Sequence, residues 1–225
     1  MEENLAPAAP VLLGSQPETS PSDYGTGAIP DGDWIRVVWI PPQDELSGYE
    51  VYRRSEEATG DSLIAFVPVV DVVEISPDTV SWIDEGVSHY VRYFYRIRAV
   101  NRTGRRSDFS NMADYKLLPK PILDAPRGEV REATPEFRFW WGGEASWITA
   151  YVIKLIDSKG GHVWISEKIY LRGYEQPVIT YYNSDGRARE PQLSPGLYRW
   201  RVDVIGPEPR CGSKSEWVEF SIRAR

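Results

Sequence analysis

The chain has 225 residues, of which 41% are hydrophobic, and it carries a formal net charge of −7 with an isoelectric point near 5.0. This hydrophobic content is too high for a disordered chain, and the negative charge disfavours general binding to nucleic acid or to anionic membranes. Because Cys211 is the single cysteine, a disulfide within the chain is excluded. The length allows one large domain or two of about 100 residues each.

Short runs in which Val, Ile, Tyr, Trp and Phe alternate with polar residues predict β-strands along the whole chain. In the first half, these runs fall near residues 9–13, 34–40, 48–54, 62–69, 79–83, 92–100 and 109–117. In the second half, they fall near residues 121–124, 136–141, 150–157, 162–167, 177–181, 197–205 and 216–223. Seven strands in each half, without an amphipathic helix, predict two β-sandwiches in tandem. The Pro- and Gly-rich segment 14–33 is predicted to be a long surface loop.

The two halves of the chain repeat one another. Trp39 falls in one alternating run, and Tyr49 opens the next run ten residues later. Trp141 and Tyr151 stand in the same relation, each 102 residues further along the chain. An equal offset across two consecutive strands indicates a tandem repeat rather than a coincidence of composition.

A proline-containing segment separates the two copies. It spans residues 118–121, Leu-Pro-Lys-Pro, and its prolines predict a short, stiff linker. The predicted organisation is therefore an N-terminal tether at residues 1–8, a first domain at 9–118 and a second domain at 119–225.

Several runs of the first copy form a specific series. Segments 39–42 (Trp-Ile-Pro-Pro), 47–53 (Ser-Gly-Tyr-Glu-Val-Tyr-Arg) and 82–86 (Trp-Ile-Asp-Glu-Gly) are similar to the corresponding runs of the fibronectin type III family. The run 93–101, Tyr-Phe-Tyr-Arg-Ile-Arg-Ala-Val-Asn, is the most specific part of the resemblance. The second copy lacks the Ala-Val-Asn segment but keeps the aromatic positions. The sequence also resembles those of fibronectin-like modules of bacterial surface proteins and lipoproteins.

The resemblance implies which side chains form the core. In this family, a tryptophan of strand B fills the centre of the sandwich, and a tyrosine at the start of strand F bonds back to the preceding corner. The core positions expected in this chain are Trp39, Tyr49 and Tyr93 in the first copy, and Trp141, Tyr151 and Tyr198 in the second. Each buried aromatic side chain of this kind removes about 150–250 Å² from water.

The sequence holds no arrangement typical of catalysis. His89 and His162 are its only histidines, and it has no metal-ligand spacing, phosphate loop, dinucleotide fingerprint or nucleophile motif. Cys211 falls in a predicted loop, where an incidental thiol is favoured over a catalytic one. We therefore expect no enzyme activity, no cofactor and no bound metal.

An arginine cluster is the first candidate binding site. Its members lie on the predicted strand 92–100 and in the loop after it: Arg92, Arg96, Arg98, Arg102, Arg105 and Arg106. Three of them, Arg92, Arg96 and Arg98, share the outward parity. The cluster suits an acidic protein partner, but cross-strand pairing with acids such as Glu50 is the favoured alternative.

The tryptophans of the second copy are the second candidate. Trp140 has outward parity beside Trp141, and Trp147 lies in the loop before the next strand. Exposed tryptophans stack on sugar rings or anchor protein interfaces. Burial of Trp140 beneath the linker or the first domain is an equally weighted alternative. The loop 14–33, which contains Tyr24, is a third candidate, although a mobile loop is favoured there.

These observations predict a non-catalytic module for protein–protein interaction or scaffolding, located outside the cytoplasm at the cell envelope or surface. A lipid-anchored cysteine before residue 1 is one hypothesis for its attachment, and the leader peptide for export is then expected upstream of this sequence. No apolar run reaches the roughly 18 residues of a membrane span. A carbohydrate-binding accessory module that uses the exposed tryptophans of the second domain is the alternative function.

Overall fold

The computed structural model describes residues 5–170 and 176–223, and these fold into two units. Unit 1 consists of the described residues up to Gln16, of Asp23–Ala28 and of Trp34–Leu117. Unit 2 consists of Pro17–Ser22, of Ile29–Asp33 and of the described residues from Leu118 onward. Of the predicted N-terminal tether, residues 1–4 lie outside the described residues, as do the last two residues of the predicted second domain.

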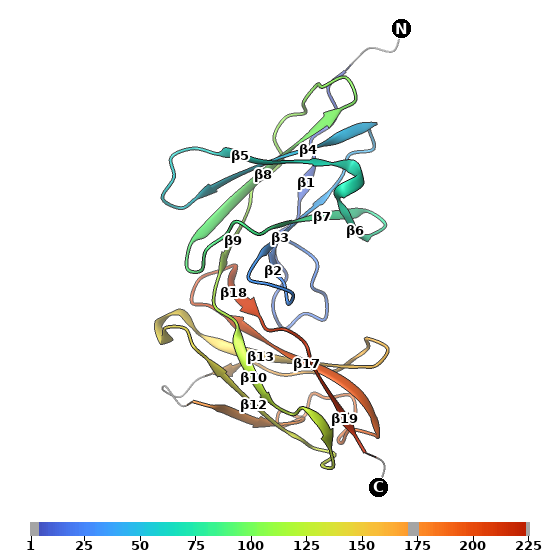
Figure 1. Cartoon of the computed structure of the whole chain (residues 1–225), viewed down its shortest axis with the longest axis vertical. Coiled ribbons are helices and arrows are strands. Elements are labelled where there is room, and N and C mark those ends of the chain that lie inside the picture. The colour runs from blue at the N-terminus through green and yellow to red at the C-terminus, as the bar shows by residue number, and fades with distance from the viewer. Residues whose placement is uncertain (1–4, 171–175, 224–225) are drawn as a thin grey trace. The chain divides into compact units, whose positions relative to one another are not determined.

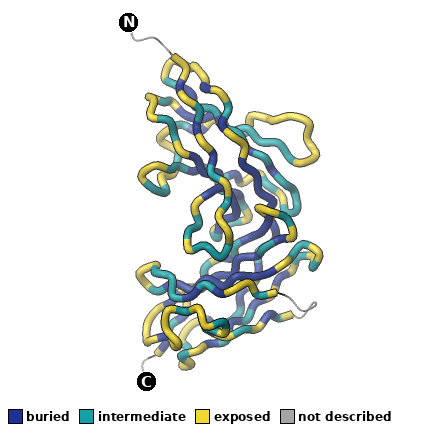
Figure 2. Tube along the Cα trace, turned by 180° about the vertical axis from the view of Figure 1, so that it is seen from behind, coloured by how far each residue is buried: buried dark blue, intermediate teal, exposed yellow. Residues whose placement is uncertain are grey.

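Strands make up nearly all of the regular structure in both units (Figure 1). Each unit packs two sheets face to face, which confirms the all-β fold with fibronectin type III-like sandwiches predicted from the sequence. Figure 2 shows the resulting burial: buried positions follow the strands, and exposed positions concentrate in the loops between them. In the part of the chain that the structure describes, no helix has the length and apolar character needed to cross a membrane.

Unit 1 contains two antiparallel sheets. The first has the strand order β1 (Val11–Leu12), β3 (Ile35–Ile40), β7 (Thr79–Asp84) and β6 (Val73–Ser76), with β2 (Gly27–Ala28) also pairing β3. The second has the order β9 (Ala113–Leu117), β8 (Arg92–Asn101), β4 (Leu46–Ser55) and β5 (Ser62–Pro68). A single 3-10 turn, η1 (Val69–Asp71), leads from β5 towards β6. Strand β5 is therefore the last strand of its sheet.

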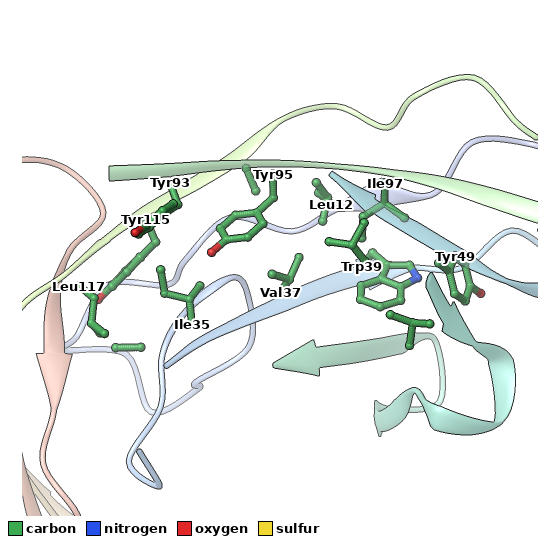
Figure 3. Close-up of a cluster of buried hydrophobic side chains, with 14 of the residues drawn as sticks. Leu12, Ile35, Val37, Trp39, Tyr49, Tyr93, Tyr95, Ile97, Tyr115 and Leu117 are labelled. Atoms are coloured by element: carbon green, nitrogen blue, oxygen red, sulfur yellow. The ribbon is translucent and has the colours of Figure 1, made fainter. Parts of the chain in front are cut away.

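The core of unit 1 lies between its two sheets, because alternate side chains of every strand point to the same side. Figure 3 shows these inward side chains, with Ile35, Val37 and Trp39 of β3 facing Tyr93, Tyr95 and Ile97 of β8. Trp39 is fully buried and packs edge-on against Tyr49, with ring centroids 5.0 Å apart.

Unit 2 repeats this arrangement with a few additional strands. Its first sheet has the order β10 (Pro121–Ala125), β12 (Glu136–Trp141) and β16 (Val178–Tyr181). In its second sheet, β13 (Ala150–Asp157) pairs with β14 (His162–Ile165), β15 (Ile169–Tyr170) and β17 (Gly196–Ile205), and β17 also pairs with β18 (Cys211–Lys214) and β19 (Val218–Ile222). Strand β11 (Gly128–Val130) runs parallel to β19, and the 3-10 turn η2 (Ala145–Trp147) precedes β13.

The core of unit 2 is built from aromatic rings. Phe137 of β12 is fully buried and contacts Trp200 at a centroid distance of 4.9 Å and Trp164 at 5.5 Å. Phe139 packs edge-on against Tyr151 at 5.0 Å. Edge-on contacts of this kind add about 0.5–1.5 kcal/mol to the burial of each pair.

The segment predicted as one long surface loop, 14–33, is divided between the two units. Within unit 2, the carbonyl oxygen of Ser20 accepts a hydrogen bond from Nζ of Lys154 at 2.8 Å, and the carbonyl oxygen of Pro21 lies 2.9 Å from Nε2 of His162. Lys154 is also paired with Asp203 at 3.3 Å, and both side chains are buried. A carbonyl group of the predicted loop thus accepts a hydrogen bond from the buried ammonium group of Lys154. The composition of the loop did not indicate this role.

The sequence prediction missed five short strands, namely β2, β6, β11, β15 and β18. Each has two to four residues, a length that shows little alternation, although β1, β14 and β16 are equally short and were predicted. One consequence is a correction: Cys211 lies at the start of β18 and is buried, rather than in a loop. A Cβ atom at Gly206 would lie 2.4 Å from the sulfur of Cys211, so the thiol is closely packed.

Candidate interaction surfaces

The outward side of the second sheet of unit 1 carries a group of arginine and aromatic side chains. In the antiparallel register, Glu50, Tyr52 and Arg54 of β4 lie opposite Arg98, Arg96 and Phe94 of β8. Opposed residues of an antiparallel pair share a face, and the neighbouring positions Tyr49 and Ile97 are in the core. We call this outward surface the arginine–aromatic face and define it by Glu50, Tyr52, Arg54, Leu63, Phe66, Phe94, Arg96, Arg98, Arg106 and Phe109.

Stacking on rings holds the guanidinium groups of this face in place. The guanidinium carbon of Arg98 lies 3.7 Å from the ring centroid of Phe109, and that of Arg54 lies 4.2 Å from the centroid of Phe94. The Phe109 ring is fixed in turn by an edge-on contact with Tyr52 at 5.0 Å. Each stacking contact contributes about 0.5–1 kcal/mol at an exposed site, and it leaves the edge of the guanidinium group available for hydrogen bonds.

Two acidic groups partly neutralise the face. Glu50 is 5% exposed, and its carboxylate accepts hydrogen bonds from Nε of Arg106 at 2.7 Å and from the hydroxyl of Tyr52 at 2.9 Å. Burial raises the pKa of Tyr52, and its hydrogen bond to Glu50 adds to that rise. Asp61 lies 3.5 Å from Nε of Arg54 and 3.8 Å from Nη1 of Arg96, so two arginines share one carboxylate.

Arg98 differs from the other arginines of the face. Its Nε is buried and has no hydrogen-bond partner, and no ion pair involves its guanidinium group among the residues that the structure describes. Its guanidinium group is therefore stacked on a ring and forms no direct ion pair, although Glu50 lies opposite Arg98 on β4. With Arg54, Arg96, Arg98 and Arg106 set against Glu50 and Asp61, the face is net positive on a chain whose formal charge is −7.

The structure brings together only some of the arginines that the sequence placed in one cluster. Arg92 forms an ion pair with Asp114 and is largely buried. Arg102 pairs with Glu45 at 3.1 Å, both being strongly exposed. Arg105 is exposed in the loop after β8. Arg96, Arg98 and Arg106 share the arginine–aromatic face, joined by Arg54, a residue that was not among the sequence candidates.

Sequence reasoning also missed the apolar part of this face. Leu63 and Phe66 of β5 lie opposite Tyr52 and Glu50 and are about half exposed. A Cβ atom at Gly48 would lie 2.7 Å from the Phe66 ring, so the absence of a side chain at Gly48 allows this ring to lie on the sheet. No signal in the sequence marked this pair, because Leu63 and Phe66 are three residues apart and share a face only through the irregular pairing at Ile64, and large apolar residues are normally assigned to the core.

The outer face of the first sheet in unit 2 is the second exposed surface. Trp140 is 37% exposed and lies opposite Ile122, which is 67% exposed. Ile179 and Tyr181 of β16 have the same parity and are also exposed. Trp147, predicted to act with Trp140, does not lie on this sheet. It belongs to η2 and is partly buried.

The six positions expected in the core are all buried, namely Trp39, Tyr49, Tyr93, Trp141, Tyr151 and Tyr198. The hydroxyl of Tyr93 accepts a hydrogen bond from the backbone N–H of Ser88 at 3.2 Å, and that of Tyr198 donates to the carbonyl oxygen of Ser194 at 2.9 Å. Both tyrosines thus bond to backbone a few residues upstream, the geometry of a tyrosine corner.

In two of the hollows of the described residues, neighbouring groups already use the polar side chains. One, of about 580 Å³ in unit 1, is lined by Arg53 and Asp84, which form an ion pair at 2.8 Å. The other, of about 300 Å³ in unit 2, is lined by Arg187 and Arg189. Arg189 donates to the carbonyl oxygen of His162 at 2.8 Å. Within the described ranges, no three His, Cys, Asp or Glu side chains converge.

Comparison with known proteins gives structural neighbours and no relatives in sequence. The chain matches no family model and no curated protein. It aligns with the FN1–FN3 domains of chicken CNTN1 at a TM-score of 0.36 and 13% identity, covering 98% of this chain and 66% of that one. It aligns with dimeric latent PorU from Porphyromonas gingivalis at a TM-score of 0.37 and 14% identity, covering all of this chain and 21% of that one. The chain therefore spans less than two thirds of each of these structures.

Proposed function

We propose that this protein is a non-catalytic interaction module whose arginine–aromatic face binds an acidic segment of a partner protein. The observation that carries the proposal is Arg98, whose guanidinium group stacks on Phe109 at 3.7 Å and has no carboxylate partner among the described residues. A buried or stacked arginine without a counter-ion is costly to maintain, whereas a partner carboxylate would form charge-assisted, often bidentate hydrogen bonds with it.

The physical properties of the face suit a protein partner better than a polyanion. Stacking fixes the arginine side chains before binding, so less rotamer entropy is lost when a partner docks. The rest of the chain is acidic and repels a continuous polyanion such as nucleic acid. A short acidic patch with apolar neighbours matches the face more closely, because Leu63 and Phe66 lie exposed beside the arginines.

The proposal is tested by cross-linking capture from a native cell fraction, with identification of the retained protein and comparison of charge variants. Arg98→Met keeps an apolar stem on Phe109 but removes the charge, and Arg102→Met is the matched control because Arg102 pairs with Glu45 away from the face. We expect one acidic protein to be retained by the unaltered chain and by Arg102→Met, and to be lost with Arg98→Met. Equal retention by both variants would contradict the proposal.

A location outside the cytoplasm, with attachment through the N-terminal segment, is part of the same proposal. It is supported by the sequence resemblance to tandem modules of bacterial surface proteins and lipoproteins. We expect protease added to intact cells to degrade the full-length gene product. Complete protection from the protease would contradict this location.

Carbohydrate binding is a second candidate, favoured by the exposed face of unit 2 rather than by the predicted pair of tryptophans. Trp140 and Tyr181 flank Ile179 on that face, and aromatic rings of this exposure stack on sugars. Affinity electrophoresis in polysaccharide gels should show retardation that is lost with Trp140→Ala and kept with Tyr170→Ala, since Tyr170 is exposed on β15 of the other sheet. Unretarded migration of the unaltered chain would remove this candidate.

A further inference from the structure

Strand β5 forms an open edge beside the arginine–aromatic face. Among the residues that the structure describes, it is the last strand of its sheet and pairs with β4 along one side only. The backbone N–H and C=O groups of alternate residues therefore point away from the sheet. Exposed edges are usually protected by charged residues, by proline or by bulges. Ser62–Pro68 contains no charged residue, so its protection is limited to the irregular pairing at Ile64 and to Pro68 at its end.

Apolar side chains continue the arginine–aromatic face up to this edge. Leu63 is 52% exposed and Phe66 is 50% exposed, and both project on the outward side of the sheet. A strand added next to β5 would lie about 4.8 Å from it and place its own outward side chains against these two. An apolar residue of that strand would then remove the Phe66 ring from water.

The charges at the edge show which polar residues such a strand carries. Asp61 directly precedes β5, and both Arg54 of β4 and Arg96 of β8 reach across the sheet to it, at 3.5 and 3.8 Å. Two guanidinium groups therefore lie near the edge and share a single carboxylate, that of Asp61. A carboxylate on an added strand, placed beside Leu63, would supply the second negative charge at the same place.

We propose that β5 is a docking edge to which an extended segment of the partner adds as a further strand, with acidic and apolar residues at every second position so that both lie on its outward side. This inference rests on the proposed function and goes beyond it, since it names the mode of binding and the pattern of the partner sequence. Main-chain hydrogen bonds along β5 hold the segment, as in other cases of strand addition, and the arginines and Phe66 select it.

The test uses the full chain, labelled with ¹⁵N, and a capped synthetic peptide of sequence Glu-Thr-Val-Thr-Glu-Thr, in which Glu and Val share one side of the strand. We expect saturable shifts of the amide signals of Ser62–Val67, and no such shifts with the counterpart in which Lys replaces Glu. Two further peptides carry N-methyl groups either on every Thr nitrogen or on the Glu and Val nitrogens. Because alternate N–H groups face opposite sides of a strand, one of these two should bind about tenfold more weakly or not at all, and the other should bind as the parent does.

The outcomes separate this inference from the proposed function. Loss of binding with Arg96→Gln, combined with equal binding of both N-methylated peptides, would overturn strand addition and leave the arginine–aromatic face as the binding site. No saturable binding of the parent peptide would also overturn strand addition, whereas the capture experiment with Arg98→Met would still decide the proposed function. Arg102→Gln serves as the control and should bind the parent peptide normally.

Discussion

At the scale of single residues, Asp84 shows how one carboxylate organises a strand end. It is 3% exposed and accepts hydrogen bonds from Nη1 of Arg53 at 2.8 Å, from the hydroxyl of Tyr95 at 2.9 Å and from the backbone N–H of Gly86 at 3.0 Å. Burial raises the pKa of Tyr95 well above its usual value, and the charge of Asp84 adds to the rise. The Tyr95 hydroxyl therefore stays protonated and acts as a donor.

This network predicts a contrast between two fully buried tyrosines. Tyr95→Phe removes a donor to a buried carboxylate and should lower the free energy of unfolding of unit 1 by about 1.5–3 kcal/mol. The hydroxyl of Tyr151 is buried without a hydrogen-bond partner of normal geometry among the described residues, and burial raises its pKa to about 12 although a contact with Gln176 opposes the rise. Tyr151→Phe should therefore be neutral or stabilise unit 2 by up to about 1 kcal/mol.

Urea denaturation of both variants, followed by tryptophan fluorescence, checks this contrast. A loss of stability in Tyr151→Phe as large as that in Tyr95→Phe would show that the hydroxyl of Tyr151 has a partner in solution, and the prediction would be wrong.

At the scale of elements, the hairpin of β4 and β5 depends on a glycine within the strand. A Cβ atom at Gly48 would lie 2.5 Å from the carbonyl oxygen of Val67 and 2.7 Å from the Phe66 ring. The close approach of β5 to β4 at this point therefore requires glycine, and the same approach sets the position of Phe66 on the arginine–aromatic face.

Two glycine substitutions in this hairpin should have opposite effects. Gly48→Ala forces the backbone of β5 outward and should destabilise unit 1 by about 1–3 kcal/mol. Gly60 lies in the loop of the same hairpin with no atom within 4 Å of the added Cβ and no positive φ. Gly60→Ala should be neutral or stabilise unit 1 by about 0.4–1 kcal/mol, because it restricts the unfolded chain. Thermal denaturation by circular dichroism measures both, and a similar destabilisation by both would contradict the stated cause.

The predictability of the elements followed their length only in part. The long strands β3, β8 and β12 were predicted from the sequence because a buried face requires a period of two, whereas the four-residue strands β6 and β18 were missed and the two-residue strand β1 was predicted. The short strands β2 and β18 are held by neighbouring strands, β3 and β17 respectively, and a sequence pattern does not contain that information. The arginines of β8 were among the candidates from the sequence. Which arginines form ion pairs depends on Asp61 and Glu50, and Arg98 stacks on Phe109. These three partners come from other segments.

At the scale of the whole molecule, each unit has its own set of buried aromatic residues. Trp39 packs on Tyr49 in unit 1, whereas Trp200 packs on Phe137 in unit 2. Both tryptophans are completely buried, and replacing a buried tryptophan with alanine costs about 3–5 kcal/mol. Such a loss is a large part of the stability of a single domain.

Calorimetry should therefore resolve two unfolding transitions that respond to different substitutions. Trp39→Ala should lower or abolish the transition of unit 1 and leave the other within about 2 °C, and Trp200→Ala should do the reverse. A single transition that shifts equally with both variants would show that the units unfold together, contrary to the prediction.

Alternation along the sequence predicted the β class and the inward positions of the long strands, because alternation over several residues is a local consequence of burying one side of a sheet. The pairing of strands determines which arginines form direct ion pairs, why Phe66 lies on the surface and which residues of 14–33 belong to unit 2. These features depend on contacts between residues far apart in the chain, such as Arg96 with Asp61 or Lys154 with Ser20. Such contacts form only when the strands are paired, so no local pattern records them.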